Sequence, residues 1–258
     1  MTFKKSKTLC LYLLAVLLLT GIAPLTFYSY TATRSDIQLI RAIKKNDLIG
    51  VRQSLASGAN ANCHDYFYDK FNFGEAFENW SQGKDYPQYK PTPLIVALDA
   101  QRDGPFQYHC LPENIDLIRE LLDKGADINA TDEDGDTPLQ IAANCGRCAT
   151  LKLLLEREKS HISQKNINTS LIIAIGLCHP EATTLLLKHG AEVNFQNQNG
   201  DTPLIMACET NQSEITKQLL ALGANPKSKN KSGETAGSIA SKYKLTDITS
   251  LLNFYDNK

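Results

Sequence analysis

Short apolar runs recur along this chain at a nearly fixed interval, and each run follows a threonine. Four of these starts are Thr92, Thr137, Thr169 and Thr202, and a weaker copy begins at Thr235. The gaps between the threonines are 45, 32, 33 and 33 residues. A period of this size predicts a stack of small similar units, in which each unit buries its apolar face against its neighbours.

Each threonine has the properties of a helix start. In Thr137-Pro138-Leu139, the threonine can cap the first free backbone N–H groups, and proline fits the first helical position, where its missing N–H is not needed. Apolar residues then follow at helical spacing. We therefore expect a first helix directly after every threonine, including Thr169, where Ser170 replaces the proline.

A second helix with a pair or triplet of leucines follows in each unit, and most of these helices are followed by a glycine. Glycine just past a helix can adopt the left-handed conformation that closes the last carbonyl groups. One glycine is missing from the series, because Glu158 stands where it is expected. The predicted unit is helix, turn, helix and a hairpin-like loop, and we count six units. The glycines are Gly58, Gly125, Gly190 and Gly223.

The segments 134–156 and 199–226 resemble ankyrin repeats, and the similarity extends over roughly residues 35–255. The resemblance implies an all-α ankyrin repeat solenoid over residues 34–258, with first helices on a concave side and hairpin loops projecting from it. It also implies a non-enzymatic protein–protein interaction scaffold. The first and last units depart from the pattern, as terminal units facing water should.

Residues 64–90 interrupt the repeat period and hold nine of the chain's twenty aromatic residues. Tyrosine and tryptophan give large contact areas with few rotatable bonds, so this insertion is our leading candidate for partner contact. The alternative is that the rings form a small core of their own. A second insertion, 100–113, is predicted to emerge at the opposite end of the helices. The expected partner-binding residues are Tyr66, Phe67, Tyr68, Phe71, Phe73, Phe77 and Trp80.

The N-terminal segment 1–33 has the pattern of a membrane anchor or a signal peptide. Lysines occupy its start, and no charged residue occurs from Thr8 to Thr33. Residues 9–30 are long enough to span a membrane once. Pro24 directly follows the best small-residue cleavage site, so we favour the anchor over a cleaved signal. Both interpretations place the repeats outside the cytoplasm, in the periplasm of a bacterium, or secreted if the signal is cleaved.

The overall charge balance gives no sign of nucleic acid as a partner. The chain carries 27 basic and 28 acidic residues, a formal net charge of −1. No basic patch on the scale of a domain is visible, so we expect a protein partner and no nucleic acid.

The chain has seven cysteines, and disulfide bonds can form between them if the repeat domain is exported to an oxidising environment. Cys110, Cys145 and Cys148 fall near the turns between first and second helices of successive repeats, so a bridge would join Cys110 to Cys145 or to Cys148. Cys208 occupies a small-residue core position and is expected to be a buried free thiol.

Neither metal binding nor catalysis is predicted. A single Cys-x-x-Cys pair with His109 nearby is a weak zinc signal, and no nucleophile–base arrangement can be argued from spacing. We expect no cofactor.

Two more specific functions stay open beside the scaffold: an immunity or inhibitor protein that neutralises a toxin or enzyme outside the cytosol, and a protective accessory factor for a membrane-side enzyme.

Overall fold

The computed structural model describes residues 34–63, 91–99, 113–132, 134–157 and 161–256. Within these ranges the chain forms helices and turns, with no strand. The helices fall into six successive pairs, which confirms the predicted number of units. The pairs are α3 (Arg34–Lys44) with α4 (Leu48–Ala56), α6 (Pro93–Asp99) with α7 (Ile115–Asp123), α8 (Pro138–Asn144) with α9 (Cys148–Leu155), α10 (Gln164–Gly176) with α11 (Pro180–Lys188), α12 (Pro203–Glu209) with α13 (Ser213–Ala221), and α14 (Ala236–Lys242) with α15 (Thr246–Asp256).

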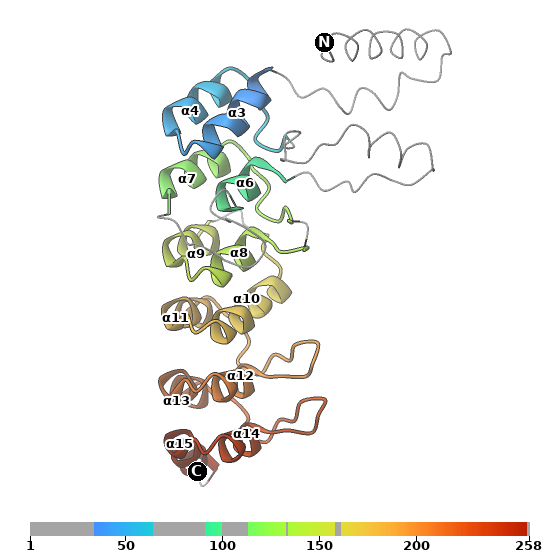
Figure 1. Cartoon of the computed structure of the whole chain (residues 1–258), viewed down its shortest axis with the longest axis vertical. Coiled ribbons are helices and arrows are strands. Elements are labelled where there is room, and N and C mark those ends of the chain that lie inside the picture. Colours follow the sequence, from blue (N-terminus) through green and yellow to red (C-terminus); the bar gives the residue numbers. More distant parts are fainter. Residues whose placement is uncertain (1–33, 64–90, 100–112, 133, 158–160, 257–258) are drawn as a thin grey trace, which may run out of the picture.

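The pairs stack into an elongated array with two columns of helices (Figure 1). First helices contact first helices, as in α8 with α10 and α12 with α14, and second helices contact second helices, as in α9 with α11. The loops before α12 and α14 project from the column of first helices (Figure 1). This side of the stack, made of the first helices and the projecting loops, is called the loop-side face below.

Threonine caps begin three of the first helices, as predicted. The side chains of Thr137, Thr202 and Thr235 accept hydrogen bonds from backbone N–H groups three residues later. At Thr137 the side chain of Gln140 accepts from the threonine's own N–H, which completes a capping box. These starts are set by local chemistry, and the sequence alone identifies them.

The expected helix start at Thr169 is wrong. Helix α10 begins at Gln164, capped by Ser163, and runs through Thr169 without interruption. In α6, α8 and α12 proline directly follows the threonine, and its ring would clash with a preceding helical turn. Ser170 keeps its backbone N–H and has no ring to clash with the preceding turn, so the helix begins at Gln164, six residues before Ser170.

The four predicted glycines end second helices in the left-handed conformation, with φ of 89°, 84°, 87° and 88° at Gly58, Gly125, Gly190 and Gly223. After Gly125, the N–H of Ala126 donates to the carbonyl of Leu121 at 3.0 Å, which is the bond of a Schellman turn that spans five residues along the sequence. In the third repeat, α9 stops at Leu155 and Glu156 takes the C-cap position. Glu158 itself lies outside the described residues.

A single ribbon of apolar side chains runs the length of the described stack. Four of the first helices, α6, α8, α10 and α12, each have a fully enclosed leucine in the first half of the repeat core, and buried alanines in α8, α10 and α12 let neighbouring helices approach closely. Each repeat shares its core with the next, so stability depends on nearest-neighbour contacts rather than on a closed interior. The enclosed leucines of the first helices are Leu94, Leu139, Leu171 and Leu204.

Among the described residues, no helix is long and apolar enough to cross a membrane. The proposed anchor at residues 9–30 lies outside this part of the chain, so the anchor and the signal peptide stay predictions. The two insertions also lie outside it, apart from Glu113 at the end of the second one.

Candidate functional site: the loop-side face

The aromatic insertion is attached to the loop-side face by its two ends. Cys63 and Pro91 flank it, and this connection between repeats one and two corresponds to the projecting loops before α12 and α14. The predicted contact residues from Tyr66 to Trp80 lie outside the described residues, so their role stays a prediction.

One side chain closes each projecting loop. The Oδ1 atom of Asn197 accepts backbone N–H groups of Asn199 and Asp201 at 2.8 and 2.9 Å. Asn230 repeats the arrangement one period later, with N–H groups of Ser232 and Glu234 at 3.0 and 2.9 Å. These side chains replace the strand pairing that the loops lack, and they fix the loop shape.

The last two loops are also joined to each other. The N–H of Lys231 donates to the carbonyl of Asn199 at 2.9 Å, and the Nδ2 group of Asn230 donates to Asp201 Oδ1 at 2.9 Å. Gly200 lies at the junction with φ of 79°, and a Cβ there would be 3.0 Å from the Lys231 nitrogen. The two loops therefore form one preorganised ridge beside α12 and α14.

A charged cluster lies at the base of this ridge. It consists of Asp201, Glu209, Glu234 and Lys242, from the two loops and the ends of α12 and α14. Lys242 Nζ lies 3.0 Å from Glu234 Oε1, which lowers the pKa of Glu234 and raises that of Lys242. Partial desolvation, and then the carboxylates of Asp201 and Glu234, raise the pKa of Glu209. Three acids face one lysine, so the cluster is negative.

Sequence reasoning missed this cluster, although a signal was present. Asp201 and Glu234 are 33 residues apart, and so are Glu209 and Lys242. Equal spacing by one repeat period places residues on the same line along a stack. Comparing the charged residues at equivalent positions of successive repeats would have identified both pairs.

The opposite ends of the helices carry the cysteines that were considered for a disulfide. Cys145 and Cys148 lie at these turns, as predicted, and Cys178 lies at the next one. Cys148 and Cys178 are free thiols. Cys110 lies outside the described residues, so its pairing stays untested. Burial raises the pKa of Cys148, and Glu181 and Glu113 add to the rise, which opposes a reactive thiolate. In the described parts of the chain, no group of three or more histidine, cysteine or acidic side chains could hold a metal ion.

Side chains at the start of the second helices join successive repeats, and sequence reasoning did not predict them. Arg147 Nη1 donates to the Leu98 carbonyl at 2.9 Å, and Gln212 Nε2 donates to the Ile175 carbonyl at 2.6 Å. His179 Nε2 lies 2.8 Å from the Asn144 carbonyl oxygen. The three residues differ in type, so no shared pattern marks the position. These bonds hold each repeat against the preceding one.

Comparisons with known proteins agree with this architecture. A family profile described as ankyrin repeats matches residues 39–166, 106–197 and 171–257. Mouse inversin is 35% identical over 104 residues, which cover 37% of this chain and 10% of inversin. A putative ankyrin repeat protein of fowlpox virus, FPV230, is 28% identical over 141 residues, covering 54% of this chain and 74% of the viral protein. The chain thus spans only about a tenth of the inversins it matches.

Two solved structures share the fold over most of the chain. An ankyrin repeat protein named EF0377 superposes with a TM-score of 0.66 at 25% identity, covering 86% of this chain and 98% of that one. The ankyrin repeat domain of Bcl-3 superposes with a TM-score of 0.61 at 22% identity, covering 85% and 86%. The matched profile covers nearly every described repeat, and this chain therefore belongs to the ankyrin repeat family.

Proposed function

We propose that this chain is a non-enzymatic scaffold that recognises a protein partner through the loop-side face and the aromatic insertion beside it. The observation that carries the proposal is the joined ridge of the last two loops, tied by the bond from Lys231 N–H to the Asn199 carbonyl. A loop that is already ordered loses little conformational freedom when a partner binds, so more of the contact energy appears as affinity.

The charge of the face sets the chemistry of the partner. The cluster of Asp201, Glu209, Glu234 and Lys242 has two more negative than positive groups at neutral pH. A partner with a basic contact surface would be steered to it, and its approach would slow in high salt. The aromatic residues of 64–90 would supply the apolar anchor that such a contact needs.

Affinity capture with matched variants tests this function. Three baits are compared: the intact chain, a form lacking residues 64–90, and the Glu209→Lys variant. The control bait is Lys217→Glu, a charge change at an exposed position of α13. We expect one defined partner with the intact chain and the control, and its loss with the other two baits. Retention of that partner by both the deletion and Glu209→Lys would refute the assignment of the face.

We propose further that the scaffold is held at a membrane by residues 9–30, with the repeats outside the cytoplasm. The support is the uncharged segment and the lysines before it. A reporter enzyme that is active only outside the cytosol, fused after Lys258, should give signal in the membrane fraction. Signal in the soluble fraction would favour a cleaved signal peptide, and no signal would refute export. The inhibitor and accessory-factor hypotheses are more specific versions of this scaffold function. The identity of the captured partner would distinguish them.

A further inference from the structure

The glutamate at the end of α12 breaks a rule of local chemistry that the neighbouring first helices follow. Glu209 is the last residue of α12, and the free carbonyl groups at a helix C-terminus repel a carboxylate. The equivalent last residues of α8, α10 and α14 are Asn144, Gly176 and Lys242, which are neutral or basic. Residues that violate such a rule without compensation are expected at functional sites.

The charge of Glu209 is matched by no hydrogen bond and no ion pair with a described residue. The two acids beside it are already engaged. Asn230 Nδ2 donates to Asp201 Oδ1 at 2.9 Å, and Lys242 Nζ lies 3.0 Å from Glu234 Oε1. Partial desolvation and these two carboxylates raise the pKa of Glu209. The folded protein therefore keeps this carboxylate at a cost to its own stability.

An uncovered apolar patch adjoins Glu209 on the column of first helices. It consists of Ile173 and Leu177, one turn apart at the end of α10, and Met206 of α12. Leu177 is 48% exposed, and the other two are half-buried at the edge of the core. Met206 and Glu209 are three positions apart on α12, so their side chains share one side of that helix. The patch and the unmatched carboxylate therefore form one continuous surface.

Gly176 leaves space in the middle of this surface. A Cβ at this position would meet only Met206 Cε, at 3.2 Å. The equivalent residues Asn144, Glu209 and Lys242 all carry side chains here, so among these four repeats the space is open only in the fourth. Methionine is unbranched and flexible, so Met206 can adapt its shape to a side chain that enters beside it.

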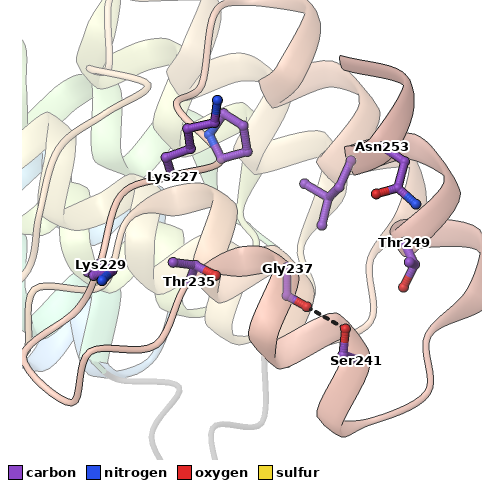
Figure 2. Close-up of a pocket in the computed structure, with 9 residues that line it drawn as sticks. Lys227, Lys229, Thr235, Gly237, Ser241, Thr249 and Asn253 are labelled. Carbon is purple, nitrogen blue, oxygen red and sulfur yellow. Dashed lines mark hydrogen bonds between the residues drawn. The ribbon is translucent and has the colours of Figure 1, made fainter. Parts of the chain in front are cut away.

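A hollow of about 400 Å³ at the last described repeat does not combine these features (Figure 2). Figure 2 shows Thr249 and Asn253 of α15 among the residues that line it, together with Gly237 and Ser241 of α14. The Ser241 hydroxyl donates to the Gly237 carbonyl at 2.9 Å. A terminal repeat must face water, which accounts for these polar side chains without an occupant.

We propose that Gly176, Met206 and Glu209 form a site for an arginine side chain of the partner, called the arginine site below. The inference rests on the proposed scaffold function and adds the chemistry that the loop-side face selects. The aliphatic stem lies along Met206 above Gly176, and the guanidinium group donates to the Glu209 carboxylate. Arginine suits this place better than lysine, because its planar group is more weakly hydrated and can donate two parallel hydrogen bonds. Leu177 contacts apolar neighbours of the arginine.

Methionine-methyl NMR tests the site on the full chain, because Met1 and Met206 are its only two methionines. The protein is isotopically labelled at the methionine methyl groups, and Met206→Leu assigns the signal. The probe is the capped tripeptide glycine–arginine–glycine, and the comparison peptide has neutral citrulline in place of arginine. We expect the arginine peptide to shift the Met206 signal and not the Met1 signal, and the citrulline peptide to bind about fivefold more weakly. An unmoved Met206 signal, or equal binding of the two peptides, would overturn the proposal.

Two variants separate the arginine site from general attraction to acidic side chains. Glu209→Gln should make the two peptides bind equally, while the matched control Glu214→Gln, at an exposed acid of α13, should keep the difference of about fivefold. Gly176→Leu fills the space for the stem without changing charge, and should weaken the arginine peptide about fivefold or more. A preference for arginine that survives Glu209→Gln, or full binding by Gly176→Leu with an unchanged melting temperature, would contradict the site.

The peptide titration and the affinity capture can fail separately. If the arginine peptide does not bind but the intact chain still captures a partner that Glu209→Lys loses, the arginine site is wrong and the scaffold function stands. If the peptide binds as expected and no partner is captured, the arginine site stands and the scaffold function is unsupported.

Discussion

The imidazole ring of His179 lies directly over Gly146 of the preceding repeat. A Cβ at Gly146 would be 2.6 Å from His179 Nδ1, and the backbone there has φ of 62°. The same ring places Nε2 2.8 Å from the carbonyl oxygen of Asn144. The turn of repeat three is thus shaped to receive one side chain of repeat four.

Replacing Gly146 with alanine should destabilise the protein by about 2–3 kcal/mol, because the methyl group meets the imidazole and the backbone is left-handed. Gly233→Ala is the matched control, since it has φ of 78° and nothing within 4 Å of its Cβ position. The control should cost only about 1 kcal/mol. Chemical denaturation measures both, and equal losses would show that His179 does not pack as described.

Ser170→Pro would restore the repeat pattern in sequence, yet we expect it to destabilise the protein by about 3 kcal/mol or more. The reason is that Ser170 lies inside α10, which runs from Gln164 to Gly176. Pro203→Ser provides the reverse comparison at the first position of α12 and should cost much less. A neutral or stabilising Ser170→Pro would mean that α10 begins at Thr169 after all.

Cys208 should resist alkylation in the folded protein at about pH 8, because burial raises its pKa to about 12. Cys178 is exposed and should react under the same conditions. Iodoacetamide labelling followed by peptide mass spectrometry distinguishes the two sites in one sample. Labelling in denaturant supplies the control, since both should then react. Rapid native labelling of Cys208 would place it outside the core.

Glu209→Gln should raise the stability of the protein near neutral pH. Partial desolvation and the carboxylates of Asp201 and Glu234 raise the pKa of Glu209, so the folded state binds its proton more tightly than the unfolded state does. The ionised form therefore opposes folding above the folded-state pKa, and this penalty fades as the pH falls through that value. Denaturation at several pH values checks the trend. A variant that is less stable than the parent at neutral pH would contradict it.

The sequence identified the parts of the fold that depend on local chemistry. Thr137 and Thr202 start helices, and Gly125 and Gly223 end them, because each acts on backbone groups within a few residues. Thr169 misled the prediction because the proline that fixes a start is absent and Ser163 offers a competing cap.

The candidate site was predictable only in part. The choice of face followed from the family resemblance, but the ridge depends on a bond between Lys231 and Asn199 in different repeats. Such contacts require the register of one repeat against the next, which local patterns do not give. Arg147, His179 and Gln212 occupy one structural position with three different side chains, so no composition rule could have found them.

The central claim is that the loop side of this stack, with the insertion attached to it, contacts the partner. Hydrogen–deuterium exchange of the full chain, alone and with the captured partner, tests it most directly. We predict slower exchange in residues 64–90, 194–209 and 227–242 when the partner is present. Protection confined to the second helices α11 and α13, or no protection anywhere, would contradict the claim.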